Sequence, residues 1–319
     1  MIVTVTANPS LDRTAGLGGP LVRGGVNRIL SVGVQAGGKG VNVARVVAMG
    51  GGEALALLPA RADDPLVAAL GELAVPFRTV PVPGLARTNL TVAEPDGTTT
   101  KINEPGAAMT EADLTALGSL VLDAARSADW VALSGSLPPG VPEDWYAHMV
   151  RQLHAHGCRV AVDTSDAPLR ALAARMPDAA PDLLKPNSEE LAQLTGADAE
   201  TLEATAAAGD LRPSVEAARA LVGRGVGAVL ATLGAAGALL VTGEGAWAAT
   251  PPPVTPRSTV GAGDSALAGY LLATTSGGQP PDCLRQAVAY GSAAASLPGT
   301  TLPQPDQTDP NAVRVRAAA

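Results

Sequence analysis

The sequence predicts an α/β protein whose central, mostly parallel sheet is covered by helices on both faces. Short β-branched runs alternate along the 319-residue chain with longer segments rich in alanine and leucine, and this alternation is typical of strand–helix–strand units. Hydrophobic residues make up 46% of the chain and aromatic residues only 2%, so the core must be assembled mainly from small aliphatic side chains. In folds of this class, ligands bind where strands end and helices begin.

The individual elements follow from local periodicity and from glycine turns. We predict strands at 2–6, 130–133, 159–162 and 229–232, and helices at 41–49 and 262–273. The most apolar stretch, 226–241, is too short to span a membrane and is interrupted by Gly234 and Gly237, which favours two core strands joined by a turn. After Pro303 the chain is polar, and we expect it to end in a short helix.

Two stretches depart from the alternation of strands and helices. Residues 22–35 and 87–103 resemble β-hairpins, and the second contains the turn sequence Pro95-Asp96-Gly97. We expect them to form a small sheet that projects from a single domain spanning residues 1–319. The sheet would act as a lid made of segments 14–35 and 87–104, approximately.

The charge balance restricts the partners. The formal net charge is -8, so the surface as a whole repels polyanions, and we expect neither nucleic acid nor a membrane as a partner. A small phosphorylated molecule can still bind, because a few local cations suffice. The first residues lack a basic stretch and a cleavage site, so we predict a soluble cytoplasmic protein.

The segment Val260-Gly261-Ala262-Gly263-Asp264 is the most informative motif. Two glycines leave backbone N–H groups bare, and the helix that follows directs its positive end toward them. Asp264 then lies in the first helical turn, beside an anion pocket. Phosphoryl transfer requires donors for the charge on the transferred group and a carboxylate to accept the hydroxyl proton. The alternative is an ordinary glycine turn with an acidic residue that the helix dipole favours.

A second glycine turn, Gly37-Gly38-Lys39-Gly40, opens the helix predicted at 41–49. Its spacing imitates a P-loop, but Gly40 stands where a P-loop needs a serine or threonine to hold Mg²⁺. The dinucleotide fingerprint GxGxxG is also missing from the sequence, which disfavours a dehydrogenase. We therefore interpret this glycine turn as a place where a polar ligand can approach the backbone closely. Asn42 could hydrogen-bond the hydroxyl groups of such a ligand.

Weaker signals lie elsewhere in the chain. Asn187 and Glu190 have the spacing of a helix capping box, and Thr232 precedes two glycines that could either admit a nucleotide or form a tight turn. Asp12 could bind a sugar hydroxyl or cap a turn. Arg87 and Lys101, on the expected lid, could clamp an anionic substrate or remain solvated.

Together these segments resemble the ribokinase-like (PfkB) sugar kinases, within the branch of 1-phosphofructokinase and tagatose-6-phosphate kinase. The resemblance covers nearly the whole chain. It is carried, in the family's order, by the segments TVTANPSLDR, AGGKGVNVAR, TKINEPG, SGSLPPGV, KPNSEE, TLGAAG and STVGAGDS.

The resemblance implies roles for individual residues. Asp264 would be the catalytic base, and the N–H groups of Gly261, Ala262 and Gly263 would form the anion hole. The nucleotide would be bound by Lys185, Asn187, Thr232, Gly234, Gly237 and Ser292. The sugar phosphate would be bound by Asp12, Gly38, Asn42, Arg87 and Ser136, with Lys39 and Lys101 near its phosphate. Glu190 resembles the acidic residue that organises Mg²⁺, largely through water.

The implied reaction moves the γ-phosphoryl group of ATP, with Mg²⁺, to the 6-hydroxyl of fructose 1-phosphate; a monovalent cation is a further candidate cofactor. Two alternatives are the same chemistry on fructose 6-phosphate or tagatose 6-phosphate, and a non-catalytic sugar-phosphate sensor. The segment Leu58–Pro65 departs from the glycine-rich pattern of relatives at the border of the sugar site, and it resembles that of the minor 6-phosphofructokinases. The family also implies a lid that pairs between subunits, and therefore a homodimer.

Overall fold

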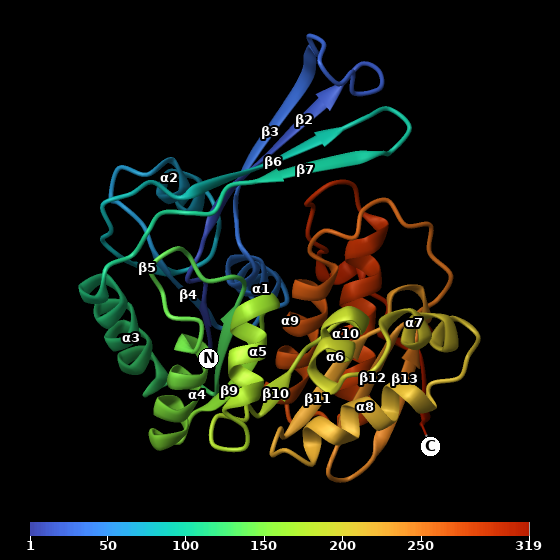
Figure 1. The fold of residues 1–319 in the computed structure, drawn as a ribbon. Coiled ribbons are helices and arrows are strands. Elements are labelled where there is room, and N and C mark those ends of the chain that lie inside the picture. The colour runs from blue at the N-terminus through green and yellow to red at the C-terminus, as the bar shows by residue number, and fades with distance from the viewer. Residues whose placement is uncertain (319) are drawn as a thin grey trace.

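A computed structural model describes residues 1–318 and contains two sheets (Figure 1). The larger sheet has ten strands in the order β14-β13-β12-β11-β10-β9-β8-β1-β4-β5. Its parallel strands are β1 (Ile2–Val5), β4 (Ala54–Pro59), β5 (Phe77–Val80), β8 (Trp130–Ser134), β9 (Arg159–Asp163), β10 (Leu183–Leu184) and β11 (Ala228–Thr232). The antiparallel extension consists of β12 (Ala238–Thr242), β13 (Ala246–Thr250) and β14 (Arg314–Ala317).

Helices cover both faces of this sheet, as the alternation in the sequence predicted. One face carries α3 (Glu111–Ala125), α4 (Trp145–Ala155), α5 (Asp166–Ala174), α6 (Ser188–Thr195), α7 (Ala199–Ala207) and α8 (Arg212–Val222). The other carries α1 (Lys39–Met49), α2 (Pro65–Gly71), α9 (Ala262–Thr275) and α10 (Pro280–Ser296). No helix within residues 1–318 combines the length and the apolar character that a membrane span requires.

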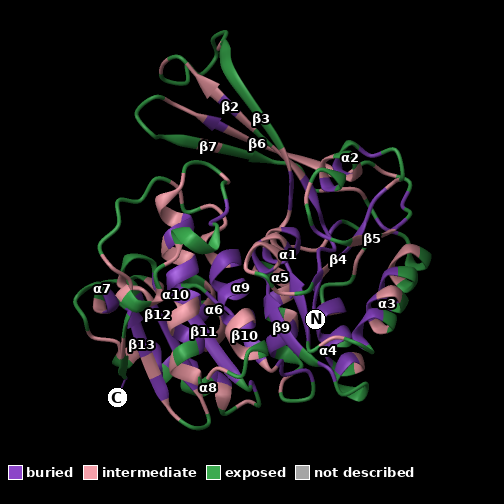
Figure 2. Cartoon of the chain, turned by 180° about the vertical axis from the view of Figure 1, so that it is seen from behind, coloured by how far each residue is buried: buried purple, intermediate pink, exposed green. Residues whose placement is uncertain are grey.

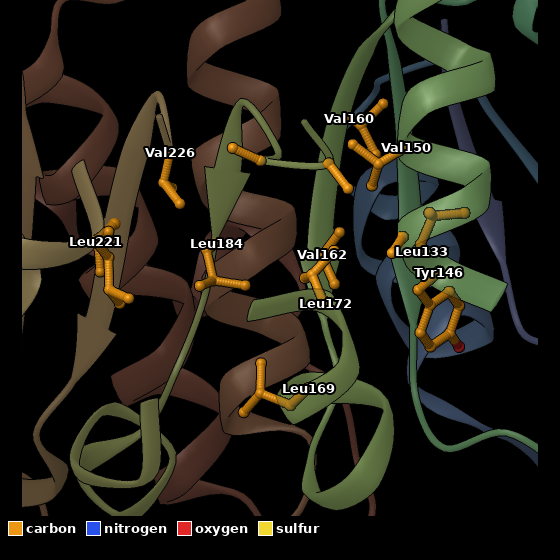
Figure 3. Close-up of a cluster of buried hydrophobic side chains, with 14 of the residues drawn as sticks. Leu133, Tyr146, Val150, Val160, Val162, Leu169, Leu172, Leu184, Leu221 and Val226 are labelled. Carbon is orange, nitrogen blue, oxygen red and sulfur yellow. The ribbon is translucent and has the colours of Figure 1, made fainter. Parts of the chain in front are cut away.

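Two apolar clusters lie on opposite faces of the large sheet because successive strand side chains point to opposite sides. On β8, Val131 and Leu133 pack with the α3–α8 face, whereas Trp130 and Ala132 pack with the α1, α2, α9 and α10 face. Figure 3 shows part of the first cluster, in which Leu133 and Val162 lie near Tyr146 of α4. The central strands are accordingly buried throughout (Figure 2).

The second sheet has four strands and stands away from the large sheet (Figure 1). Its order is β3-β2-β6-β7, with bounds β2 (Ser10–Leu17), β3 (Ile29–Gly37), β6 (Arg87–Ala93) and β7 (Thr99–Asn103). We call it the lid sheet. The turn between β6 and β7 is closed by hydrogen bonds between Glu94 and both Gly97 and Thr98, at the predicted Pro95-Asp96-Gly97 sequence.

Three details of the sequence prediction were wrong. The lid sheet begins at Ser10, not at residue 14, so Asp12 is a residue of the lid sheet. Residues 22–28 form a loop instead of a strand, because Gly24 and Gly25 interrupt the strand pattern there. The last element, Arg314–Ala317, is a strand and not a helix: its alternating valine and arginine residues pair antiparallel with β13 and extend the sheet.

Candidate active site

The start of α9 has the geometry that the glycine motif predicted. Gly261 precedes the helix with a φ of 78°, in the left-handed region that favours glycine. Its carbonyl accepts the first helical hydrogen bond from Ser265 N (2.8 Å), and Ala262 N makes only a long contact with Thr259 O (3.4 Å). A helix start leaves its first N–H groups available for an anion. At Gly263, a Cβ atom would lie 3.2 Å from Lys185 Nζ, so the missing side chain lets that cation approach the helix start.

Asp264 follows these amides in the first turn of α9, and only 6% of it is exposed. Its Oδ2 accepts a hydrogen bond from Asn42 Nδ2 of α1 at 2.9 Å, so two helix starts distant in sequence meet at this carboxylate. Burial raises the pKa of Asp264 above its ordinary value, and the nearby Lys39 opposes this shift. A buried carboxylate with a raised pKa and a fixed orientation is suited to accept a proton.

A second buried carboxylate, Asp163 at the end of β9, lies between two lysines. Its Oδ1 is 2.8 Å from Lys39 Nζ and its Oδ2 is 3.2 Å from Lys185 Nζ, while the side chain is fully buried. Burial alone would raise the pKa of Asp163, but the two ammonium groups hold it below its ordinary value. Burial would conversely lower the pKa of Lys39, and Asp163 and then Asp264 raise it above its usual range. Lys39 is therefore held as a cation.

Asp163 was not among the site residues predicted from the sequence. The available signal was its place at the carboxyl end of a predicted strand, which is where ligand sites of α/β folds lie. The partner lysines could not be inferred, because they follow β3 and β10, which are distant in the sequence and belong to different sheets.

A cavity of about 840 Å³ opens beside this cluster. It is lined by every residue that the resemblance assigned to the nucleotide, together with Glu190, Lys39, Ala262 and Gly263. The assigned nucleotide residues are Lys185, Asn187, Thr232, Gly234, Gly237 and Ser292. Apolar side chains such as Pro252 and Val288 form part of the wall. One cavity thus joins an apolar wall to lysines and helix-start amides, a combination suited to an aromatic base carrying phosphates.

Asn187 and Glu190 have a structural role as well as a place in the cavity wall. Asn187 N donates to Glu190 Oε2 (2.9 Å) and Glu190 N donates to Asn187 Oδ1 (2.8 Å), which is the predicted capping box of α6. Burial raises the pKa of Glu190 above its ordinary value. Glu190 is one of three glutamate residues in the cavity lining, with Glu189 and Glu203. A carboxylate in this position fits Mg²⁺, which binds one or two carboxylates together with substrate phosphates and water.

The remaining predicted residues are not in the lining of this cavity, and three of them share one face of the lid sheet. In the strand register, Gln35, Asp12, Asn89 and Asn103 lie side by side across the four strands. Arg87 pairs with Ser10, two residues before that row, and Lys101 pairs with Thr91, two residues beyond it. Because residues two apart point to the same side, Asp12, Arg87 and Lys101 belong to a single polar face.

This polar face is turned toward α1. Arg45 of α1 donates to Gln35 Oε1 (3.4 Å), and Asp12 Oδ1 accepts from Ser10 Oγ (2.7 Å) and Asn89 Nδ2 (3.1 Å). Burial lowers the pKa of both Arg45 and Arg87, and the Asp12 carboxylate opposes the shift in each. Asn89 and Arg45 were not predicted as site residues from the sequence, because their positions on this face depend on strand register and on the packing of α1.

Ser136 follows β8 of the large sheet, and Gly38 lies between β3 of the lid sheet and α1. Ser136 Oγ accepts from Asn8 Nδ2 (3.1 Å), and the turn before it is fixed by Tyr146, whose hydroxyl donates to Gly135 O (3.0 Å). Asn8 and Arg87 both line a small hollow of about 10 Å³. Gly38 precedes α1 with a φ of 109°. Of the residues predicted to bind the sugar phosphate, only Arg87 lines this hollow. The Asn42–Asp264 hydrogen bond links α1 to the start of α9.

Comparisons with known proteins show the family of the chain. Residues 9–307 match the family model described as pfkB family carbohydrate kinase. The chain is 38% identical to 1-phosphofructokinase of Rhodobacter capsulatus, over 96% of this chain and 94% of that protein. It is 35% identical to ATP-dependent 6-phosphofructokinase isozyme 2 of Escherichia coli, over 96% of both. The crystal structure of phosphofructokinase-2 from Escherichia coli in complex with substrates and products superimposes with a TM-score of 0.86 at 34% identity, over 96% of each chain.

The fold prediction is confirmed by the same comparisons. Ribokinase from Thermotoga maritima has a TM-score of 0.74 at 18% identity, over 96% of this chain and 97% of that one, and at this identity the likeness concerns the fold alone. The family match and the curated relatives extend over nearly the whole chain. The chain therefore belongs to the pfkB family of carbohydrate kinases.

Proposed function

We propose that this protein is an ATP-dependent 1-phosphofructokinase, which converts fructose 1-phosphate to fructose 1,6-bisphosphate. The observation that carries the proposal is the buried Asp264, oriented by Asn42 in the first turn of α9. Ala262 and Gly263 of the same turn line the cavity, together with Lys39 and Lys185. The curated relatives with this activity, at 38% identity, support the choice of substrate.

In the proposed reaction, the 6-hydroxyl oxygen of the sugar attacks the γ-phosphorus of ATP while the bond to the β–γ bridging oxygen breaks. Asp264 accepts the hydroxyl proton, and Asn42 holds the carboxylate in position through its hydrogen bond. The amides of residues 261–263 and the cations Lys39 and Lys185 stabilise the charge of the migrating group. Mg²⁺, when bound through Glu190 and water, would supply further neutralisation of the phosphates.

The substrate is tested by a panel of fructose 1-phosphate, fructose 6-phosphate, tagatose 6-phosphate and free fructose, with ATP and Mg²⁺. We expect the highest kcat/KM with fructose 1-phosphate. A preference for fructose 6-phosphate would favour the alternative activity of the 35% identical isozyme 2 from Escherichia coli, which the resemblance of the Leu58–Pro65 segment also supports. A preference for free fructose, or no turnover of any sugar phosphate, would contradict the proposal.

The acid limb of the pH profile tests the role of Asp264. Only the carboxylate accepts a proton, so kcat/KM falls as the pH decreases through the pKa of Asp264. The hydrogen bond from Asn42 favours the charged form and lowers this pKa. We therefore expect Asn42→Ala to move the acid limb to higher pH. The exposed Asn311→Ala serves as the control and should leave the profile unchanged. An acid limb that stays in place, or moves to lower pH, would contradict the assigned role.

We also propose that the lid sheet covers the sugar site and pairs with the lid sheet of a second copy. The face opposite Asp12 is largely apolar: Leu30, Val32, Val34 and Ile102 are 75%, 51%, 53% and 57% exposed. The exposed Arg13 lies on the same face, between Val34 and Leu90. In the register, Val34 and Ile102 belong to one row across the four strands. We call Leu30, Val32, Val34 and Ile102 the outer lid face. Figure 2 shows the exposure of the outer strands β3 and β7. An apolar surface of this kind on a projecting sheet favours burial against a copy of itself.

Light scattering tests the dimer. We expect a mass of twice the 31.7 kDa chain, and Val32→Glu/Val34→Glu should shift the protein to the monomer, because it places charges at the centre of the contact. Leu85 is similarly exposed, at 52%, but lies outside the outer lid face, so Leu85→Glu should remain dimeric. A wild-type monomer at micromolar concentration would contradict the proposal.

A further inference from the structure

Asp64 is a buried carboxylate in the segment that departs from the family pattern. It lies between β4 and α2 and is only 3% exposed. Its Oδ1 accepts a hydrogen bond from Leu66 N at 2.8 Å, which makes it the N-cap of α2. Capping explains one oxygen of the carboxylate but leaves the burial of the other to be explained, because a cap needs only one acceptor.

The second oxygen connects Asp64 to the substrate side of the lid sheet. Asp64 Oδ2 accepts from Ala86 N at 2.6 Å, and Ala86 is the residue immediately before Arg87 at the start of β6. Arg61 adds a longer hydrogen bond from Nη1 to Pro83 O, at 3.4 Å. The segment therefore contacts the loop that leads into β6 at two points, one of them adjacent to Arg87.

The Arg87 guanidinium group is buried and, within the described part of the chain, has a donor that is not used in a hydrogen bond. Its Nη1 donates to Glu104 O at 3.3 Å, while its Nε is buried without a hydrogen-bond partner among residues 1–318. Burial lowers the pKa of its guanidinium group, and Asp12 opposes that shift. A buried guanidinium group with an unused donor can bind an anion. An arginine binds a phosphate well only when its planar group is correctly oriented.

We propose that Asp64 is a positioning residue for the sugar phosphate: it fixes the backbone at Ala86 and thereby holds the Arg87 guanidinium where the substrate phosphate binds. This inference rests on the proposed function, in which Arg87 contacts that phosphate. This proposal assigns a function to the Leu58–Pro65 segment, because the Asp64 carboxylate connects the start of α2 to the start of β6.

Two substitutions separate positioning from capping. In Asp64→Ser, the hydroxyl group can still cap α2, since serine is among the preferred N-caps, but its single short side chain cannot also reach Ala86 N. In Asp64→Ala both hydrogen bonds are lost. We expect both variants to raise KM for the sugar phosphate about 10- to 100-fold, the scale of a binding group displaced by about an ångström. KM for ATP should change less than about twofold, and only the alanine variant should lose the thermal stability that the cap provides.

The control is Asp182→Asn, which removes a carboxylate that accepts from Val160 N (2.7 Å) at the opposite ends of the parallel strands. It should leave both KM values unchanged. Asp64→Ser is then combined with Arg87→Ala. If Asp64 acts through Arg87, the double variant has the KM of Arg87→Ala alone, because effects that share one group are not additive.

Three results would overturn the inference: an unchanged KM for the sugar phosphate in Asp64→Ser, an equal rise in KM for ATP, or effects that multiply in the double variant. If Arg87→Ala itself left KM unchanged, the phosphate clamp on which the inference rests would be refuted. Absence of sugar-phosphate turnover by the wild-type enzyme would instead refute the proposed function, so the two failures are distinguishable.

Discussion

Replacement of Asp264 by asparagine is expected to lower kcat about 10²- to 10⁴-fold, the usual contribution of a general base. The amide has nearly the same size as the carboxylate and can still interact with Asn42, but it cannot accept the proton that the sugar hydroxyl loses. The residues proposed to bind the nucleotide line the cavity, whereas Asp264 does not, so the affinity for ATP should be nearly unchanged. Steady-state kinetics with a titration of ATP binding measures both quantities.

Asp282→Asn provides a matched control for this prediction. Asp282 lies in the first turn of α10, as Asp264 lies in the first turn of α9, but it is exposed. Loss of a favourable interaction with the helix dipole would affect both variants alike, whereas loss of a base affects only one. Activity of Asp264→Asn within a few-fold of the wild type would refute the assignment of the base, and with it the proposed mechanism.

The local parts of the site could be predicted from the sequence because their geometry depends on neighbouring residues. The glycine motif at 261–263 places its amides before a helix whatever surrounds it, and the Asn187–Glu190 capping box is set by a spacing of three residues. The strand–helix alternation likewise predicted a sheet covered on both faces, since each element buries its own apolar side. For these features, local sequence and tertiary structure agree.

The features of the site and the lid sheet that could not be predicted depend on contacts between segments distant in the sequence. The pairing of Lys39 and Lys185 with Asp163 requires the packing of three distant segments, which periodicity does not specify. The contact between Asp64 and Ala86 is also tertiary, although the same residue is recognisable as a helix cap. The start of the lid sheet was misplaced because β2 pairs with β6 in parallel, outside the hairpin that the turn residues indicate.

The Lys39–Asp163–Lys185 cluster holds two positive charges and one negative charge close together inside the protein. Two ammonium groups must be available to the phosphates, yet without a counter-charge they would repel each other inside the protein. Asp163 supplies this charge from a fully buried position, and the ion pairs keep it ionised although burial opposes ionisation. The same negative charge contributes to the raised pKa of Asp264. Asp163 therefore influences both the cations and the base.

Asp163→Asn is accordingly expected to affect both stability and catalysis. Removing one member of a buried ionic cluster typically destabilises a protein by about 3–5 kcal/mol, measurable by urea unfolding. Misplacement of the lysines should lower kcat/KM about 10²-fold. The surface pair of Asp129 with the amino terminus offers the control, since Asp129→Asn should cost at most about 1 kcal/mol.

The pH profile separates an electrostatic role of Asp163 from a purely structural one. Because the Asp163 charge raises the pKa of Asp264, its removal should move the acid limb of kcat/KM to lower pH, opposite to the shift expected for Asn42→Ala. A variant that is merely less stable would lose activity without that displacement. If Asp163→Asn kept wild-type activity and an unchanged profile, the lysines would not depend on this carboxylate, and the cations of the site would have to be positioned by other contacts.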